Sequence, residues 1–113
     1  MRDVLSLKSQ KLRAYVVWVP ILEGDSAEAA RLEASLYPDK RLTHYWDDGG
    51  KIAQEVGARL GLDMKAWDVY LVFEKRAKWS SPPGFWMHQL DGLKSAPWLD
   101  SAKLRGKVED LLP

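Results

Sequence analysis

The stretch HYWDDGGKIAQEVGARLGLDMKAWDVYLVFEKRAKW, residues 44–79, decides the expected fold. It begins inside a segment, 41–47, whose side chains alternate between two faces as in a β-strand. A helix is expected next, and Gly61 is well placed to end it in the left-handed conformation. The run WDVYLVFE, 67–74, then gives the strongest strand signal in the chain, and KRA, 75–77, reads as a hairpin turn. The stretch therefore predicts strand, helix and strand in succession.

The expected central helix has both an apolar stripe and a start signal. Ile52, Val56 and Leu60 are spaced i, i+4 and i+8, so they lie on one helix face. Asp47 or Asp48 stands where an N-cap residue is preferred. This pattern predicts that the helix packs one side against the sheet.

Toward the N-terminus, AYVVWVPIL, 14–22, predicts another strand. The segment is rich in β-branched and aromatic residues and is nearly continuously apolar, which is typical of a strand covered on both faces. Pro20 removes one ladder hydrogen bond, so the strand should end near it.

A helix should follow the sequence EGDS, 23–26. Asp25 is a good N-cap, and Glu28 three residues later completes the pattern of a capping box. Asp25 and Ser26 also stand at a helix N-terminus, which favours anions, although capping alone explains both. The expected buried face of this helix comprises Ala29, Leu32 and Leu36.

Toward the C-terminus, the pattern becomes irregular before a last helix. Lys78 and Trp79 are expected to begin a strand, and Pro82 and Pro83 then rule out regular pairing. An edge strand is expected over 85–90. The final helix, 99–112, starts at Asp100 or Ser101, and its expected buried stripe is Leu104, Val108 and Leu111.

These elements define an α/β protein with the order β-α-β-α-β-β-α. Strands that alternate with helices imply parallel pairing through right-handed crossovers, and the last two strands imply a hairpin. We therefore expect a four-stranded mixed central sheet flanked by helices. Residues 1–13 are expected to form a polar N-terminal arm, and residues 14–113 a single domain.

The order and lengths of these elements resemble the thioredoxin fold. The segments HYWD, AWDVYLVF and FWMHQL are also similar to segments of uncharacterised bacterial thioredoxin-like proteins. In thioredoxins a Cys-x-x-Cys pair opens the first helix, and a cis-proline precedes the third strand. Here EGDS, 23–26, holds the first place, and Ala66 or Trp67 holds the second. The resemblance thus implies a thioredoxin-like domain without thiol–disulfide activity.

Composition excludes several functions. The chain of 113 residues has 17 Lys and Arg against 16 Asp and Glu, which gives no field for steering onto nucleic acid or an anionic membrane. It contains no cysteine, so disulfides, thiolate nucleophiles and Cys-based zinc sites are excluded. No apolar run reaches the length of a signal peptide core or a membrane span, which predicts a soluble protein, cytoplasmic by default. Nothing in the sequence implies a cofactor.

Two histidines, His44 and His88, are the main candidates for catalysis. Asp47 and Asp68 stand near expected strand ends, and two histidines with a carboxylate can hold a divalent metal. No HxH or HExxH spacing is present, so no metal site is predicted. A thiol-independent enzyme that uses His44 or His88 with Asp47 or Asp68 is the alternative hypothesis.

Six tryptophans in a chain of this size are unusual. Trp18, Trp46 and Trp67 lie in or beside expected strands, so they are expected to build the core. A second aromatic and apolar group in the C-terminal third could form an exposed binding groove: Trp79, Phe85, Trp86, Met87 and Trp98. The leading hypothesis is a binding or protein-interaction domain, with a protein or peptide as its partner. The oligomeric state is left open.

Overall fold

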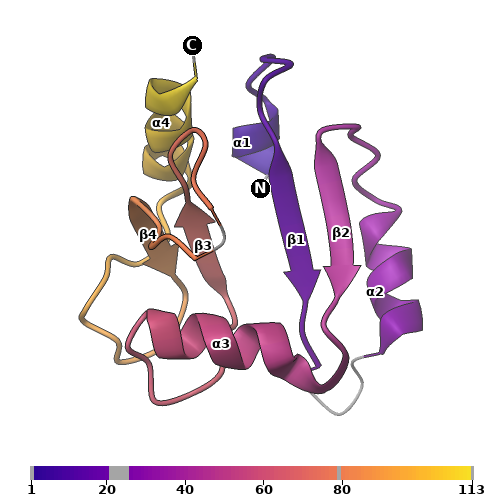
Figure 1. Ribbon diagram of the computed structural model, residues 1–113. Coiled ribbons are helices and arrows are strands. Elements are labelled where there is room, and N and C mark those ends of the chain that lie inside the picture. The colour runs from indigo at the N-terminus through magenta and orange to yellow at the C-terminus, as the bar shows by residue number, and fades with distance from the viewer. Residues whose placement is uncertain (1, 21–25, 79, 113) are drawn as a thin grey trace. The chain divides into compact units, whose positions relative to one another are not determined.

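The computed structural model describes residues 2–20, 26–78 and 80–112 (Figure 1). The chain divides into two compact units. The βαβ unit is Leu12–Trp67, and the hairpin unit combines Met1–Lys11 with Asp68–Pro113. Among the described residues, no helix has the length and apolar character needed to cross a membrane.

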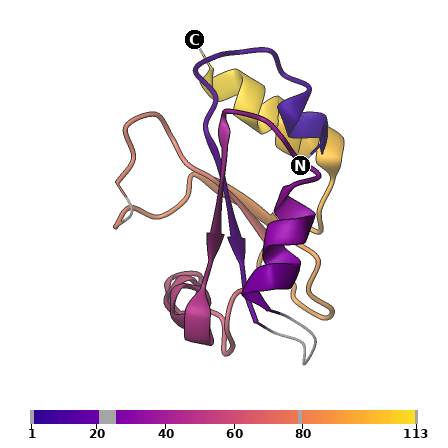
Figure 2. The ribbon, with the colours of Figure 1, turned by 90° about the vertical axis from the view of Figure 1, so that its right-hand side faces the viewer.

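The βαβ unit is built on a pair of parallel strands. Its elements are β1 (Ala14–Trp18), α2 (Ala27–Ala34), β2 (Leu42–Trp46), the short 3-10 turn η1 (Asp48–Gly50) and α3 (Lys51–Arg59). The register places Ala14 opposite Leu42 at one end and Trp18 opposite Trp46 at the other. Viewed from the sheet edge in Figure 2, α2 lies on one side of the strands and α3 lies beside their carboxyl ends. The predicted strand–helix–strand start of the chain is therefore confirmed.

Helix α2 begins one residue later than the capping pattern predicts. Ser26 is its N-cap, and the Ser26 hydroxyl accepts a hydrogen bond from the Ala29 N–H at 3.0 Å. Asp25, the predicted cap, lies outside the described residues. The buried residue of α2 is Ala30, at 7% exposure. Leu32 and Leu36 are 66% and 67% exposed, so the predicted buried face is wrong because the helix packs through its alanines.

Helix α3 begins later than its sequence predicts, because residues 48–50 form a 3-10 turn and Gly50, in the left-handed conformation, is the N-cap of α3. The two carboxylate oxygens of Asp47 accept hydrogen bonds from the Ile52 and Ala53 N–H groups, at 3.0 and 2.9 Å. Asp47 thereby satisfies two amides that a helix start leaves without partners. Gly61 has φ +75°, as predicted for the residue that ends this helix.

The hairpin unit contains α1 (Arg2–Leu5), β3 (Val69–Val72), β4 (Phe85–His88) and α4 (Ser101–Leu111). β3 and β4 pair antiparallel, from Val69 opposite His88 to Val72 opposite Phe85. The opposite edge of β4 also forms backbone hydrogen bonds. The His88 N–H donates to the Pro97 carbonyl at 3.2 Å, and the Leu99 N–H donates to the His88 carbonyl at 2.7 Å. β4 is thus held on both edges, by β3 and by residues 97–99.

Helix α4 has the predicted cap, but its predicted buried stripe is wrong beyond Leu104, because Val108 is half-buried and Leu111 is 40% exposed. Asp100 caps it by accepting the Lys103 N–H at 3.0 Å, and Leu104 is 6% exposed. The expected polar arm at residues 1–13 is wrong in its first part, because residues 2–5 form α1, which packs against α4. Val4 supplies the apolar contact, at 6% exposure, and the Arg105 guanidinium donates to the Ser6 hydroxyl at 3.1 Å.

The expected four-stranded central sheet is wrong. The described strands form two separate sheets of two strands each, β1 with β2 and β3 with β4. The expected hairpin of β3 with β4 does form. The error lies in the expected parallel pairing of β3 with the β1–β2 pair, which the alternation of strands and helices implies and the described strands do not show.

The predicted strand start at Lys78 also differs from the structure. Residues 73–84 connect β3 to β4 without a strand among those described. A turn does form at Lys75–Arg76, where the Ala77 N–H donates to the Glu74 carbonyl at 3.0 Å. The strand expected over 85–90 does form as β4, but it ends at His88, and residues 97–99 bond to its second edge.

Candidate functional site

The carboxyl ends of β1 and β2 carry two tryptophans. Trp18 and Trp46 are the last residues of their strands and face each other in the parallel register. Both are half-buried, so neither joins the fully buried core that the sequence predicts for them, and Trp67 is half-buried as well. Ligands of parallel sheets commonly bind beyond the carboxyl ends of the strands. A ligand-binding site is therefore expected at this edge of the β1–β2 pair.

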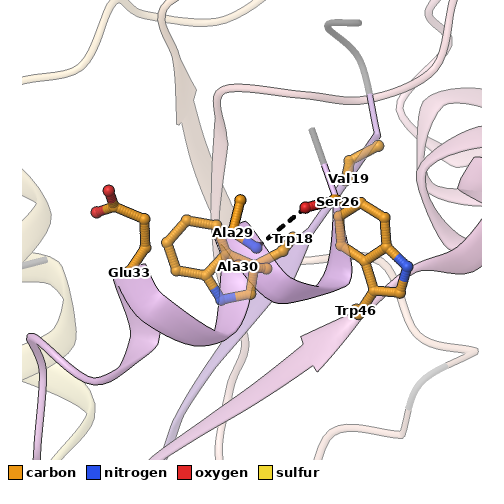
Figure 3. A pocket seen from close by; sticks show the side chains of 7 residues that line it. All are labelled: Trp18, Val19, Ser26, Ala29, Ala30, Glu33 and Trp46. Atoms are coloured by element: carbon orange, nitrogen blue, oxygen red, sulfur yellow. Dashed lines mark hydrogen bonds between the residues drawn. The ribbon is translucent and has the colours of Figure 1, made fainter. Parts of the chain in front are cut away.

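A shallow hollow of about 100 Å³, open to solvent, lies between these strand ends and α2 (Figure 3). This volume is well below the range of about 300–1,000 Å³ that is typical of small-molecule sites, so the hollow is too small to enclose a drug-sized ligand. The described residues that line it are Trp18, Val19, Ser26, Ala29, Ala30, Glu33 and Trp46.

Helix α2 forms one wall of the hollow because of its sequence spacing. Ser26, Ala29, Ala30 and Glu33 follow the i, i+3, i+4 and i+7 pattern of a single helix stripe. The two alanines have side chains too small to fill the space against the indole rings. In Figure 3, Glu33 lies at one end of the labelled side chains, Trp46 at the other, and Trp18 between them.

The ring of Trp18 is fixed by His44. The Trp18 indole N–H donates to His44 Nδ1 at 3.1 Å, and the two rings stack with centroids 6.0 Å apart and planes 19° apart. An indole N–H can only donate, so Nδ1 must accept and the ring proton lies on Nε2. That Nε2 is buried and has no hydrogen-bond partner among the described residues. His44, predicted as a catalytic candidate, therefore acts here as the support of one wall of the hollow.

Glu33 is the single charged residue among the described lining residues. Its carboxylate forms no ion pair with any other described residue. It also lies near the C-terminus of α2, where the helix dipole adds negative partial charge. The electrostatic field of Glu33 and of this helix end therefore favours a positively charged group.

Two exposed leucines lie in and just after α2. Leu32 lies one helical turn after Ala29, which lines the hollow, and Leu36 follows the end of the helix at Ala34. The two leucines are 66% and 67% exposed and are not among the described lining residues.

His88 is engaged through both ring nitrogens. Nδ1 accepts the Leu90 N–H at 2.9 Å, so Nε2 carries the proton and donates it to the Ala96 carbonyl at 2.8 Å. The side chain is 1% exposed and contacts the rings of Trp86 and Trp98, with centroid distances of 6.0 and 5.8 Å. His88 therefore joins β4 to the 89–99 segment, and neither nitrogen is available to a substrate.

The predicted carboxylates are not available as catalytic bases in a cleft. Asp47 is 3% exposed, and both of its oxygens are occupied at the start of α3. Asp68 is exposed, with φ +51°, and its backbone carbonyl accepts the Gln89 N–H at 2.9 Å. Burial, and secondarily the charge of Asp68, raises the pKa of Tyr70, which keeps this phenol protonated as it donates to Gln89 Oε1 at 3.0 Å.

The predicted aromatic groove is only partly present. Trp98 is 53% exposed, but Met87 is 1% exposed and cannot contact a partner. Phe85 and Trp86 are half-buried, and Trp79 lies outside the described residues. The Phe85 ring is covered by the ammonium groups of α4, 5.2 Å from Lys107 and 6.0 Å from Lys103. Among the described residues of this group, Trp98 alone is exposed.

Sequence reasoning missed the hollow because it assigned Trp18 and Trp46 to the core. The one available signal was position, since both residues end a parallel strand and Glu33 follows Ser26 by seven residues. Among the described residues, no three His, Asp or Glu side chains are grouped to hold a metal ion. No protein-family model, curated protein or solved structure matches this chain significantly.

Proposed function

We propose that this chain is a binding domain that recognises a protein partner at the carboxyl edge of the βαβ unit. The hollow beneath α2 receives one side chain of the partner, and Leu32 and Leu36 contact the surface around it. The observation that carries this proposal is the hollow lined by Trp18 and Trp46, and the exposed Leu32 and Leu36 of the same unit support it. Tryptophan is enriched at the centres of protein interfaces, where a buried anchor contributes most of the binding energy.

The alternative of a histidine-based enzyme has less support. A general base needs a free acceptor within reach of its substrate. His44 Nδ1 is occupied by the Trp18 N–H, and His88 uses both nitrogens within the hairpin unit. The same hydrogen bonds give each histidine a structural role, which favours the binding domain.

The proposal is tested by selecting, from a displayed random library, peptides that bind the purified chain. Binders from a random library are measured against the wild type, Trp46→Ala and the control Trp98→Ala, which removes the exposed indole of the hairpin unit. We expect Trp46→Ala to weaken the selected peptides at least tenfold and Trp98→Ala to leave them within twofold, because Trp46 lines the hollow and Trp98 is not among its described lining residues. Peptides that bind Trp46→Ala as tightly as the wild type would overturn the proposal.

A further inference from the structure

We infer that the partner side chain that enters the hollow is basic, a lysine or an arginine. This inference rests on the proposed function and specifies its chemistry. Three independent features of the hollow support it: the charge of its lining, the kind of aromatic ring that walls it, and its length along α2.

The charge of the lining favours a cation. Glu33 is the one ionisable group among the described lining residues, and no described lysine or arginine neutralises it. An acidic side chain would meet this carboxylate and the negative end of the α2 dipole together.

The aromatic walls also favour a cation. An indole is the side chain that attracts cations most strongly through its ring face. Trp18 is held in place by its hydrogen bond to His44, so little ordering is required of it when a ligand binds. The His44 ring carries one proton, on Nε2, so it brings no positive charge against an incoming cation.

The shape of the hollow suits a long aliphatic stem with a charged end. From Ser26 to Glu33 the helix rises about 10 Å, at 1.5 Å per residue. Ala29, Ala30 and the two indoles offer apolar contact along this length, and the carboxylate stands at one end. Lysine and arginine bury such a stem against apolar surface while the charged head reaches a polar group.

The experiment titrates the full chain with n-butylammonium and with its neutral analogue 1-butanol, followed by tryptophan fluorescence. The variants are Glu33→Gln in the lining and Glu28→Gln, an exposed charge on the same helix outside the lining. We expect n-butylammonium to bind the wild type more tightly than 1-butanol. Glu33→Gln should weaken the ammonium about fivefold, as for loss of one partly exposed ion pair, with little effect on the alcohol. Glu28→Gln should change neither.

The outcomes separate the inference from the proposed function. Equal binding of the two probes, or equal effects of Glu33→Gln and Glu28→Gln, would overturn the inference and leave the peptide test of Trp46 unaffected. Selected peptides that require Trp46 and carry a common Lys or Arg sensitive to Glu33→Gln would support both. Ammonium binding that depends on Glu33, with no Trp46-dependent peptide, would support a basic ligand and overturn the protein partner.

Discussion

Replacement of His88 by alanine should destabilise the hairpin unit by about 3–5 kcal/mol. The side chain is 1% exposed and holds the Leu90 N–H and the Ala96 carbonyl at 2.9 and 2.8 Å. Each backbone group left buried without a partner costs about 1–3 kcal/mol, and the lost ring adds a cavity between Trp86 and Trp98. A catalytic histidine, by contrast, could be removed with little change in the free energy of unfolding.

Two further variants of His88 separate its hydrogen bonds. The amide oxygen of His88→Asn can replace Nδ1 as the acceptor for Leu90, and the amide nitrogen of His88→Gln can replace Nε2 as the donor to Ala96. Each should therefore recover roughly 1 kcal/mol relative to alanine.

The assay for this series is urea unfolding, together with hydrogen exchange of the Leu90 amide, and the exposed Asp91→Ala serves as control. With a slope of about 1.5 kcal/mol/M, His88→Ala should lower the urea midpoint by roughly 2–3 M, whereas the control should stay within about 0.5 kcal/mol of the wild type. A loss under about 1 kcal/mol for His88→Ala, or unchanged protection of Leu90, would refute the structural role of His88.

Three further changes test the fold and its electrostatics. Asp47→Ala should cost roughly 2 kcal/mol in urea unfolding, because two amides at the start of α3 lose their acceptor, and a cost near zero would contradict this cap. Gly57→Ala should destabilise the chain by at least about 1 kcal/mol, since a Cβ there would lie 2.1 Å from the Met64 carbonyl oxygen; an equally stable variant would disprove that approach. Hydrogen bonds from Arg41, first from its side chain and then from its backbone N–H, lower the pKa of Asp39 from 3.8 to about 2. The stabilisation is thus complete above the unfolded-state pKa and is lost as the pH falls through about 2. Carboxyl NMR should therefore show a midpoint near 2 in the wild type and a higher midpoint, still below 3.8, in Arg41→Gln, which keeps the backbone N–H of residue 41. Identical midpoints would exclude the Arg41 side chain as a cause.

Local signals in the sequence predicted individual elements well. Asp47 and Gly61 mark the two ends of α3 by chemistry that acts within a few residues, and the structure places both in those roles. Phe85 and Asp100 likewise mark the start of β4 and the cap of α4.

Strand pairing and the site were not predictable in the same way. An apolar strand such as 67–74 fits a central or an edge position of a sheet equally well, and its sequence does not determine which strand it pairs with. Trp18 and Trp46 line a hollow only because the alanines of α2 lie opposite them. His88 is held at both ring nitrogens only because the 89–99 segment folds back along β4. These contacts depend on the meeting of distant segments, which periodicity does not encode.

The hollow beneath α2 is expected to bind a ligand. NMR of the indole N–H signals tests this binding most directly. The chain has six tryptophans, and single Trp→Phe variants assign their resonances. On addition of n-butylammonium, the Trp18 and Trp46 signals should shift together and saturate, while that of Trp98 stays in place. Shifts confined to Trp98, or spread evenly over all the indoles, would contradict the account.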